Sequence, residues 1–164
     1  MGRESVLVVC PGRGTYGANE LGTLARYHAG DPLLANFDRL REDHGAETIT
    51  ALDSAPSFST KRHGSGENAS PLIYAASLLD FLALDPAKFE IVAVCGNSMG
   101  WYTALACAGA VSPEHGFAIA DAMGINSGTG EPGGQVLLTL VGEDWRPEPS
   151  LRVEVDREIG RAHV

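Results

Sequence analysis

The stretch Ile91–Gly100 reads IVAVCGNSMG and decides the fold. Its first five residues form a continuous, partly β-branched apolar run, which is typical of a strand buried on both faces of a parallel sheet. Gly96–Gly100 follows as a turn with the pattern G-x-S-x-G, and the alanine-rich segment Trp101–Ala110 predicts a helix. A strand, a tight turn around Ser98 and a helix, in this order, form the context of a nucleophile elbow.

The two glycines of this motif have a physical purpose. The turn is strained, and a Cβ atom at either end would collide with the neighbouring strand or helix. The turn would expose the hydroxyl of Ser98 at the carboxyl end of the sheet. The backbone N–H of Met99 would then lie at the positive end of the helix, where an oxyanion is stabilised. The alternative is an ordinary glycine-rich turn, but the context favours Ser98 as a catalytic nucleophile.

A second loop of the same kind lies near the amino end. Ser5–Cys10 (SVLVVC) predicts another buried strand, and Gly12–Gly17 (GRGTYG) follows it with the pattern G-x-G-x-x-G. A dinucleotide-binding fold needs a second strand that ends in an acidic residue about 20 positions later. Asp38 has this spacing but lies in an expected helix, so nucleotide binding is disfavoured. Both loops are expected at one carboxyl edge of the sheet, where the first loop can offer a second backbone N–H beside Ser98.

The remaining pattern alternates helices with these strands. It predicts an α/β fold in which a parallel sheet with flanking helices carries the nucleophile elbow. We expect helices that begin at Asn19, at Asp31-Pro32 (ended by Gly45), at Ser70-Pro71 and at Ser112-Pro113 (ended by Gly124), a loop over 50–67, a glycine-rich linker over 127–134, and strands over Gln135–Val141 and Leu151–Val155.

Composition narrows the class of protein. The chain of 164 residues has a net charge of −9, which disfavours nucleic-acid binding. Its three cysteines form no disulfide framework or zinc motif, and no segment has the length of a signal peptide or a membrane span. We therefore expect a cytoplasmic protein with no membrane partner and no metal. The basic cluster Lys61–His63 is interpreted as a solvated loop. No histidine has a sequence neighbourhood that marks it as the base that Ser98 needs.

The two loops together resemble the malonyl-CoA:acyl-carrier-protein transacylases and the acyltransferase domains of polyketide and fatty-acid synthases. The family pattern P-G-Q-G-[ST] is similar to Pro11–Thr15, and G-H-S-[LM]-G-E-[YW] is similar to Gly96–Tyr102. The small-residue helix after the serine and the segment Asn68–Ala76 also resemble the family in order and spacing. The resemblance covers residues 5 to about 141.

The resemblance implies a ping-pong reaction of fatty-acid or polyketide biosynthesis. Ser98 would take a malonyl-like acyl group from CoA and pass it to the phosphopantetheine thiol of an acyl carrier protein. The backbone N–H groups of Met99 and Arg13 would form the oxyanion hole, and no bound cofactor is implied. Candidate acyl-binding residues are Met123, Arg13 and Asn97.

The sequence departs from the family pattern at several points. Asn97 replaces a histidine, Trp101 replaces a glutamate, and Met123 stands where the family has its carboxylate-binding arginine. Either the acyl group is uncharged, or another cation such as Arg13 substitutes. The serine hydrolase or esterase and the non-catalytic acyl- or carrier-binding module remain as alternatives.

The expected organisation is that of an amino-terminal fragment. Residues 1–125 would form the first part of the acyltransferase core, and residues 126–157 would begin a small ferredoxin-like subdomain. The segment Glu158–Val164 (EIGRAHV) resembles a translated sequencing adapter and is interpreted as a non-native tail. The family's catalytic histidine would lie beyond residue 164, so this fragment is expected to be inactive alone.

Overall fold

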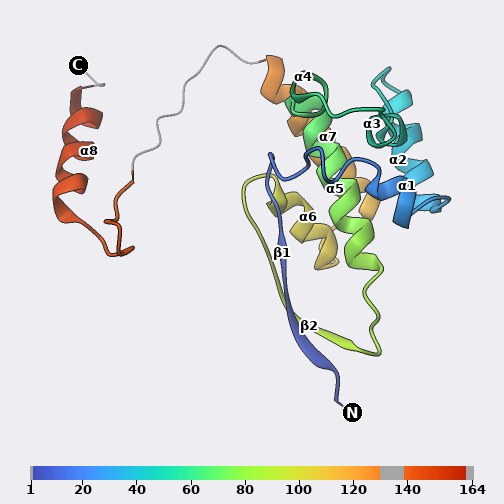
Figure 1. Ribbon diagram of the computed structural model, residues 1–164, viewed down its shortest axis with the longest axis horizontal. Coiled ribbons are helices and arrows are strands. Elements are labelled where there is room, and N and C mark those ends of the chain that lie inside the picture. Colours follow the sequence, from blue (N-terminus) through green and yellow to red (C-terminus); the bar gives the residue numbers. More distant parts are fainter. Residues whose placement is uncertain (1, 130–138, 162–164) are drawn as a thin grey trace. The chain divides into compact units, whose positions relative to one another are not determined.

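The computed structural model describes residues 2–129 and 139–161. They fall into two compact units, Met1–Gly130 and Glu131–Val164, each with its own structure. The first unit contains, in chain order, β1 (Glu4–Cys10), α1 (Thr23–Tyr27), α2 (Pro32–Glu42), α3 (Ile49–Asp53), α4 (Thr60–His63), α5 (Gly66–Leu82), β2 (Phe89–Gly96), α6 (Gly100–Cys107) and α7 (Pro113–Thr129) (Figure 1).

The two expected strands pair in parallel, as the sequence predicts. Val8 lies opposite Val94, and the register shifts between Val6 and Leu7. The prediction that the strands are buried on both faces is wrong for one face. Leu7 is 57% exposed and Val9 is 64% exposed, because within the described residues helices cover only the other side of this pair.

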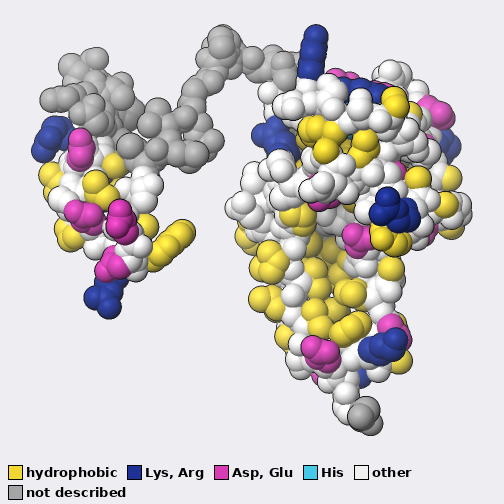
Figure 2. Space-filling view, in the orientation of Figure 1, with side chains coloured by type: hydrophobic (Ala, Val, Ile, Leu, Met, Phe, Trp, Pro, Cys, Tyr) yellow, Lys and Arg dark blue, Asp and Glu magenta, His cyan; other side chains and the backbone are white. Residues whose placement is uncertain are grey.

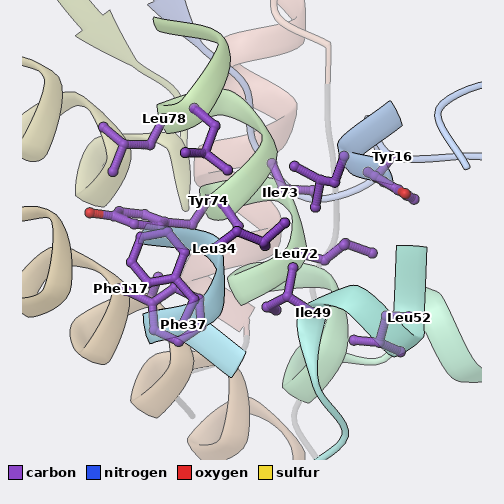
Figure 3. Packing of buried hydrophobic residues seen from close by; sticks show 14 of the residues in the cluster. Tyr16, Leu34, Phe37, Ile49, Leu52, Leu72, Ile73, Tyr74, Leu78 and Phe117 are labelled. Atoms are coloured by element: carbon purple, nitrogen blue, oxygen red, sulfur yellow. The ribbon is translucent and has the colours of Figure 1, made fainter. Parts of the chain in front are cut away.

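The core of the first unit lies among the helices. Phe37 of α2 stacks on Phe117 of α7 with ring centroids 4.3 Å apart, and Tyr74 of α5 meets both rings edge-on (Figure 3). All three rings are buried. Edge-to-face and offset pairs of this kind add to the stabilisation that burial alone gives. This aromatic cluster fixes α2, α5 and α7 against one another.

Helix α7 extends further than the sequence predicts. Gly124 was expected to end it, but the helix continues to Thr129. The reason for this glycine is close packing, since a Cβ atom on Gly124 would overlap the carbonyl oxygen of Gly66 at the start of α5. The predicted beginning of α7 is confirmed, because the Ser112 hydroxyl accepts a hydrogen bond from the N–H of His115 at 3.2 Å.

Helix α5 begins earlier than Ser70-Pro71, where the sequence predicts its start. Ser65 is the N-cap, and Pro71 lies inside the helix. A proline there removes the N–H that would bond the carbonyl of Glu67, one turn earlier. The buried guanidinium of Arg41 replaces that donor and reaches the Glu67 oxygen at 2.9 Å. A residue of α2 therefore satisfies the carbonyl that the proline leaves without its helical partner.

Two short helices, α3 and α4, occupy the segment 50–67 that was expected to be a loop. Asp53 at the end of α3 is buried, and its carboxylate accepts hydrogen bonds from the backbone N–H groups of Leu24 and Ala25 at 3.2 and 2.9 Å. It also pairs with the Tyr16 hydroxyl. The Asp53 carboxylate therefore caps α1. The sequence predicts Asn19 as the cap of this helix, and that prediction is wrong. The cap is not visible in a local pattern because the two partners are separated by about 30 residues.

The basic cluster Lys61–His63 is not the solvated loop that the sequence suggests. It forms α4, in which Arg62 pairs with Glu47 and His63 is 1% exposed. His63 stacks on Phe58 with ring centroids 5.1 Å apart, and its ring nitrogens lie within hydrogen-bond distance of Ser59 and the Leu52 carbonyl. His63 is therefore part of the packing between α3 and α4, whereas Lys61 is exposed.

Helix α8 (Pro149–Arg161) dominates the described part of the second unit. The expected strand Leu151–Val155 is wrong, because these residues are helical. The sequence here also places oppositely charged residues four positions apart, which favours a helix. The Nε atom of Arg152 donates a hydrogen bond to the Asp156 carboxylate at 3.1 Å, across one helical turn. The expected strand Gln135–Val141 lies largely outside the described residues, and Val141 forms only an isolated bridge with Pro147.

Candidate functional site

The turn after β2 holds Ser98 in an unusual backbone conformation. Its φ angle is 52°, in the left-handed region that residues with a side chain rarely adopt. A Cβ atom on Gly96 would overlap the backbone of Gly100, and one on Gly100 would overlap the carbonyl of Cys10. The collisions that the sequence predicts for the two glycines are therefore present. The side chain of Ser98 is exposed.

The loop after β1 lies directly against this turn. The N–H of Asn97 donates to the Cys10 carbonyl at 3.3 Å, where the two parallel strands end. A Cβ atom on Gly12 would lie 3.0 Å from the Asn97 carbonyl oxygen and 3.5 Å from Cβ of Ser98. Glycine at position 12 thus lets the first loop approach the serine closely. The two motifs from distant parts of the sequence meet at one sheet edge, as expected.

A cavity of about 270 Å³ opens where the two loops meet. It gathers four residues that the sequence singles out and three that it does not: Arg13, Ser98, Met99 and Met123, together with Ser70, Tyr102 and Ser127. Asn97, the remaining candidate, does not line it. The three missed residues come from α5, α6 and α7. Ser70 and Tyr102 lie within segments that resemble the family pattern, but neither of them was predicted to have a role in the site. Helical spacing is a further signal, since Ser127 lies one turn after Met123 and Tyr102 lies four residues after Ser98.

Arg13 connects the first loop with α7. Its Nη1 atom donates to the Ser127 hydroxyl at 3.1 Å, and that hydroxyl donates to the Gly124 carbonyl at 2.7 Å. A Cβ atom on Gly66 would lie 3.0 Å from the same Nη1 atom. The cavity therefore contains one guanidinium, three serine hydroxyls and the tyrosine ring, with two methionines as its apolar part.

The histidines that the structure describes are engaged elsewhere or lie apart from this cavity. His28 lies 2.7 Å from Asp80 beside a separate cavity of about 160 Å³. His44 lies 3.0 Å from Asp121, His63 is buried between α3 and α4, and His115 is exposed. None of these four lines the cavity with Ser98. The described residues therefore bring Ser98, Met99 and Arg13 together around one cavity that no described histidine lines.

Two cysteine thiols lie close to each other in the first unit. The sulfur atoms of Cys10 and Cys107 are 4.0 Å apart, at the ends of β1 and α6. Burial raises the pKa of the Cys10 thiol and raises that of Cys107 to about 12. Both stay protonated near neutral pH, and a protonated thiol is a poor nucleophile. Ser98, which lines the cavity, is therefore a better candidate for covalent chemistry.

The described residues hold no group of three or more histidine, cysteine, aspartate and glutamate side chains arranged to bind a metal ion. None of the described helices has the length and hydropathy needed to cross a membrane.

Comparison with known proteins finds likeness at the level of structure. The chain resembles MCAT from Mycobacterium tuberculosis with a TM-score of 0.61 at 24% identity, over 74% of this chain and 39% of that structure. It also resembles acyl-carrier-protein S-malonyltransferases from Vibrio cholerae (TM-score 0.57, 20% identity, 84% and 45%) and Burkholderia pseudomallei (0.51, 19%, 77% and 39%). No family model and no curated protein matches the sequence.

At these identities the likeness shows the fold. The chain has the α/β arrangement of these malonyltransferases over most of its own length, and it spans about two fifths of theirs.

Proposed function

We propose that this chain belongs to an acyltransferase that moves an acyl group from a CoA thioester to the phosphopantetheine thiol of an acyl carrier protein. One observation carries the proposal. A serine at φ 52° lies in a cavity at the carboxyl edge of a parallel strand pair, between the two glycine-containing loops. This geometry supports the interpretation of the turn as a nucleophile elbow. The structural neighbours, which are named as malonyltransferases, support the same class of reaction.

The first half-reaction forms an acyl-enzyme. The Ser98 oxygen bonds to the thioester carbonyl carbon and gives its proton to a base, and the carbonyl oxygen gains negative charge. The N–H of Met99, at the N-cap of α6, and that of Arg13, in the facing loop, would donate to this oxyanion. The carbon–sulfur bond then breaks, and CoA leaves as the thiol after it takes up the proton.

The second half-reaction reverses these steps with another thiol. The pantetheine sulfur attacks the Ser98 ester, the carbon–oxygen bond breaks, and the serine regains its proton. Attack by water at the same stage would make the chain a hydrolase, and no attack at all would make it a binding module. The two glycine loops are compatible with all three outcomes, so the fate of the acyl group decides among them.

The base is the part of this mechanism that the described residues do not provide. A serine without a positioned base loses about 10²–10⁴-fold in rate. The expectation that this fragment is inactive alone therefore means a loss of full turnover, which needs a base from outside the described residues, and the 164-residue chain should react only slowly. Slow reaction still leaves a measurable product when the reaction is followed over hours.

The product of the reaction tests this proposal. The full chain is incubated with acetyl-CoA or malonyl-CoA and excess pantetheine, and acyl-pantetheine and free acid are quantified over hours. We expect acyl-pantetheine to form faster than with Ser98→Ala, while Ser77→Ala, a serine of α5 that borders the other cavity, leaves the rate unchanged. Free acid as the main product would instead favour a hydrolase. Equal rates for the wild type and Ser98→Ala would refute the proposal.

A further inference from the structure

The guanidinium of Arg13 lies in the cavity without a carboxylate partner among the described residues. Its hydrogen bond is to the neutral hydroxyl of Ser127, and no lining residue is acidic. Six other described arginines pair with acidic side chains: Arg41 with Asp121, Arg62 with Glu47, and Arg3, Arg39, Arg146 and Arg152 with nearby acidic residues. Arg26 instead lies over the Tyr27 ring. Arg13 therefore keeps donors available for an anion.

The structure leaves space for this side chain. Gly66, the first residue of α5, faces the guanidinium, and a Cβ atom there would overlap the Ser127 hydroxyl and lie 3.0 Å from Nη1 of Arg13. Ser127 lies one helical turn after Met123, and both line the cavity. The guanidinium thus reaches the part of α7 that borders the acyl pocket, although it comes from the opposite loop.

The charge of Arg13 affects different acyl groups in different ways. An uncharged acyl chain would displace water from the guanidinium without offering it an acceptor, which is unfavourable. A terminal carboxylate accepts two parallel N–H bonds from a guanidinium, which is the strongest geometry for this pair. Met123 contributes no charge to the same pocket. The cavity therefore favours an acyl group that ends in a carboxylate.

We infer that Arg13 is the residue that selects a carboxylate-terminated acyl group, and that it does so from the first loop while Met123 provides apolar contact. This inference rests on the proposed function, because it concerns the acyl group that Ser98 accepts. Arg13 then has two separate roles. Its backbone N–H faces the oxyanion, and its side chain binds the far end of the acyl group.

The test compares two thioesters that differ by one carboxylate. Dissociation constants of malonyl-CoA and acetyl-CoA are measured by calorimetry for the full chain, Arg13→Gln, Arg13→Lys and the control Arg26→Gln, whose guanidinium lies over the Tyr27 ring. Loading of Ser98 is followed in parallel by mass spectrometry. We expect the preference for malonyl-CoA to fall by about 10- to 100-fold in Arg13→Gln, to fall less in Arg13→Lys and to be unchanged in Arg26→Gln.

A second variant separates a specific role from general damage. In the double variant Arg13→Gln/Met123→Arg, a guanidinium on α7 enters the same cavity and should restore most of the malonyl preference. An unchanged preference in Arg13→Gln, or equal affinity of the wild type for both thioesters, overturns the inference and leaves the proposed function standing if Ser98 is loaded. If Ser98 is not loaded but the preference for malonyl-CoA depends on Arg13 as expected, the inference about Arg13 stands and the proposed function fails. If neither thioester binds, both fail.

Discussion

At the scale of single residues, Ser98 belongs to the proposed site and Arg41 to the packing of the fold. A non-glycine residue at positive φ costs of order 1–3 kcal/mol and persists only when its surroundings hold it. At Ser98 the close contacts of Gly96, Gly100 and Gly12 do so. The buried Arg41 has a structural role instead, since it satisfies acceptors from three segments around the start of α5. Its partners are the Glu47 and Glu67 carbonyls, Asn68 and Asp121.

Removal of the Arg41 guanidinium should therefore destabilise the first unit strongly. Arg41→Met leaves the buried carboxylate of Asp121 without its guanidinium partner, and loss of one partner of a buried ion pair typically costs about 3–5 kcal/mol. Arg39→Met, two residues away on the same helix, removes an exposed pair with Asp43 and an exposed hydrogen bond to Asn36, and should cost less than about 1 kcal/mol. Urea denaturation measures both changes, and similar losses for the two variants would contradict this role.

At the scale of elements, α5 and α7 form the most extensive helix–helix contact in the first unit. Small residues set their separation. Gly116 faces the Tyr74 hydroxyl, and Gly124 faces the first turn of α5, close to the cavity residues Ser70 and Ser127. The position of α7 therefore controls where Met123 and Ser127 lie relative to Ser98.

Gly124→Ala tests this packing. In an exposed helix the change would stabilise by about 1 kcal/mol, because alanine has the higher helix propensity. Here the added methyl group would overlap the Gly66 carbonyl, so we expect a net loss of roughly 1–3 kcal/mol in the free energy of unfolding. Ala118→Ser, at an exposed position of α7, serves as the control and should have little effect. A more stable Gly124→Ala protein would mean that α7 can move away from α5 without cost.

The elements also show what the sequence can predict. Asp31 caps α2 by accepting the N–H of Leu33 at 2.8 Å, and Gly45 adopts φ 75° after it, both as the local pattern indicates. Local patterns fail to predict a helix boundary where a residue that is distant in the sequence determines it. The Ser70-Pro71 pair has the pattern of a helix start, yet Arg41 allows α5 to begin at Gly66. Likewise the meeting of Ser98 with Arg13 could be expected from the two strands, whereas Ser70, Tyr102 and Ser127 could not.

At the scale of the whole molecule, one side of the strand pair has no helix among the described residues. Leu7, Val9 and Val92 are each more than half exposed, and hydrophobic side chains gather where β1 and β2 lie (Figure 2). Contiguous apolar surface of this kind favours contact with other polypeptide. The resembling malonyltransferases are nearly twice as long as this chain. In the proposed reaction, the described residues would provide the nucleophile, the oxyanion donors and the acyl cavity.

The most direct measurement is the mass of the peptide that contains Ser98 after the full chain has been incubated with a short acyl-CoA. The proposed mechanism predicts an acyl group on Ser98, formed over hours, lost on treatment with a pantetheine thiol and absent from Ser98→Ala. The cavity contains its own internal comparison, since Ser70 and Ser127 line the same space without the strained turn. An adduct on either of those serines, or one that persists at equal yield in Ser98→Ala, would contradict the assignment of Ser98 as the nucleophile.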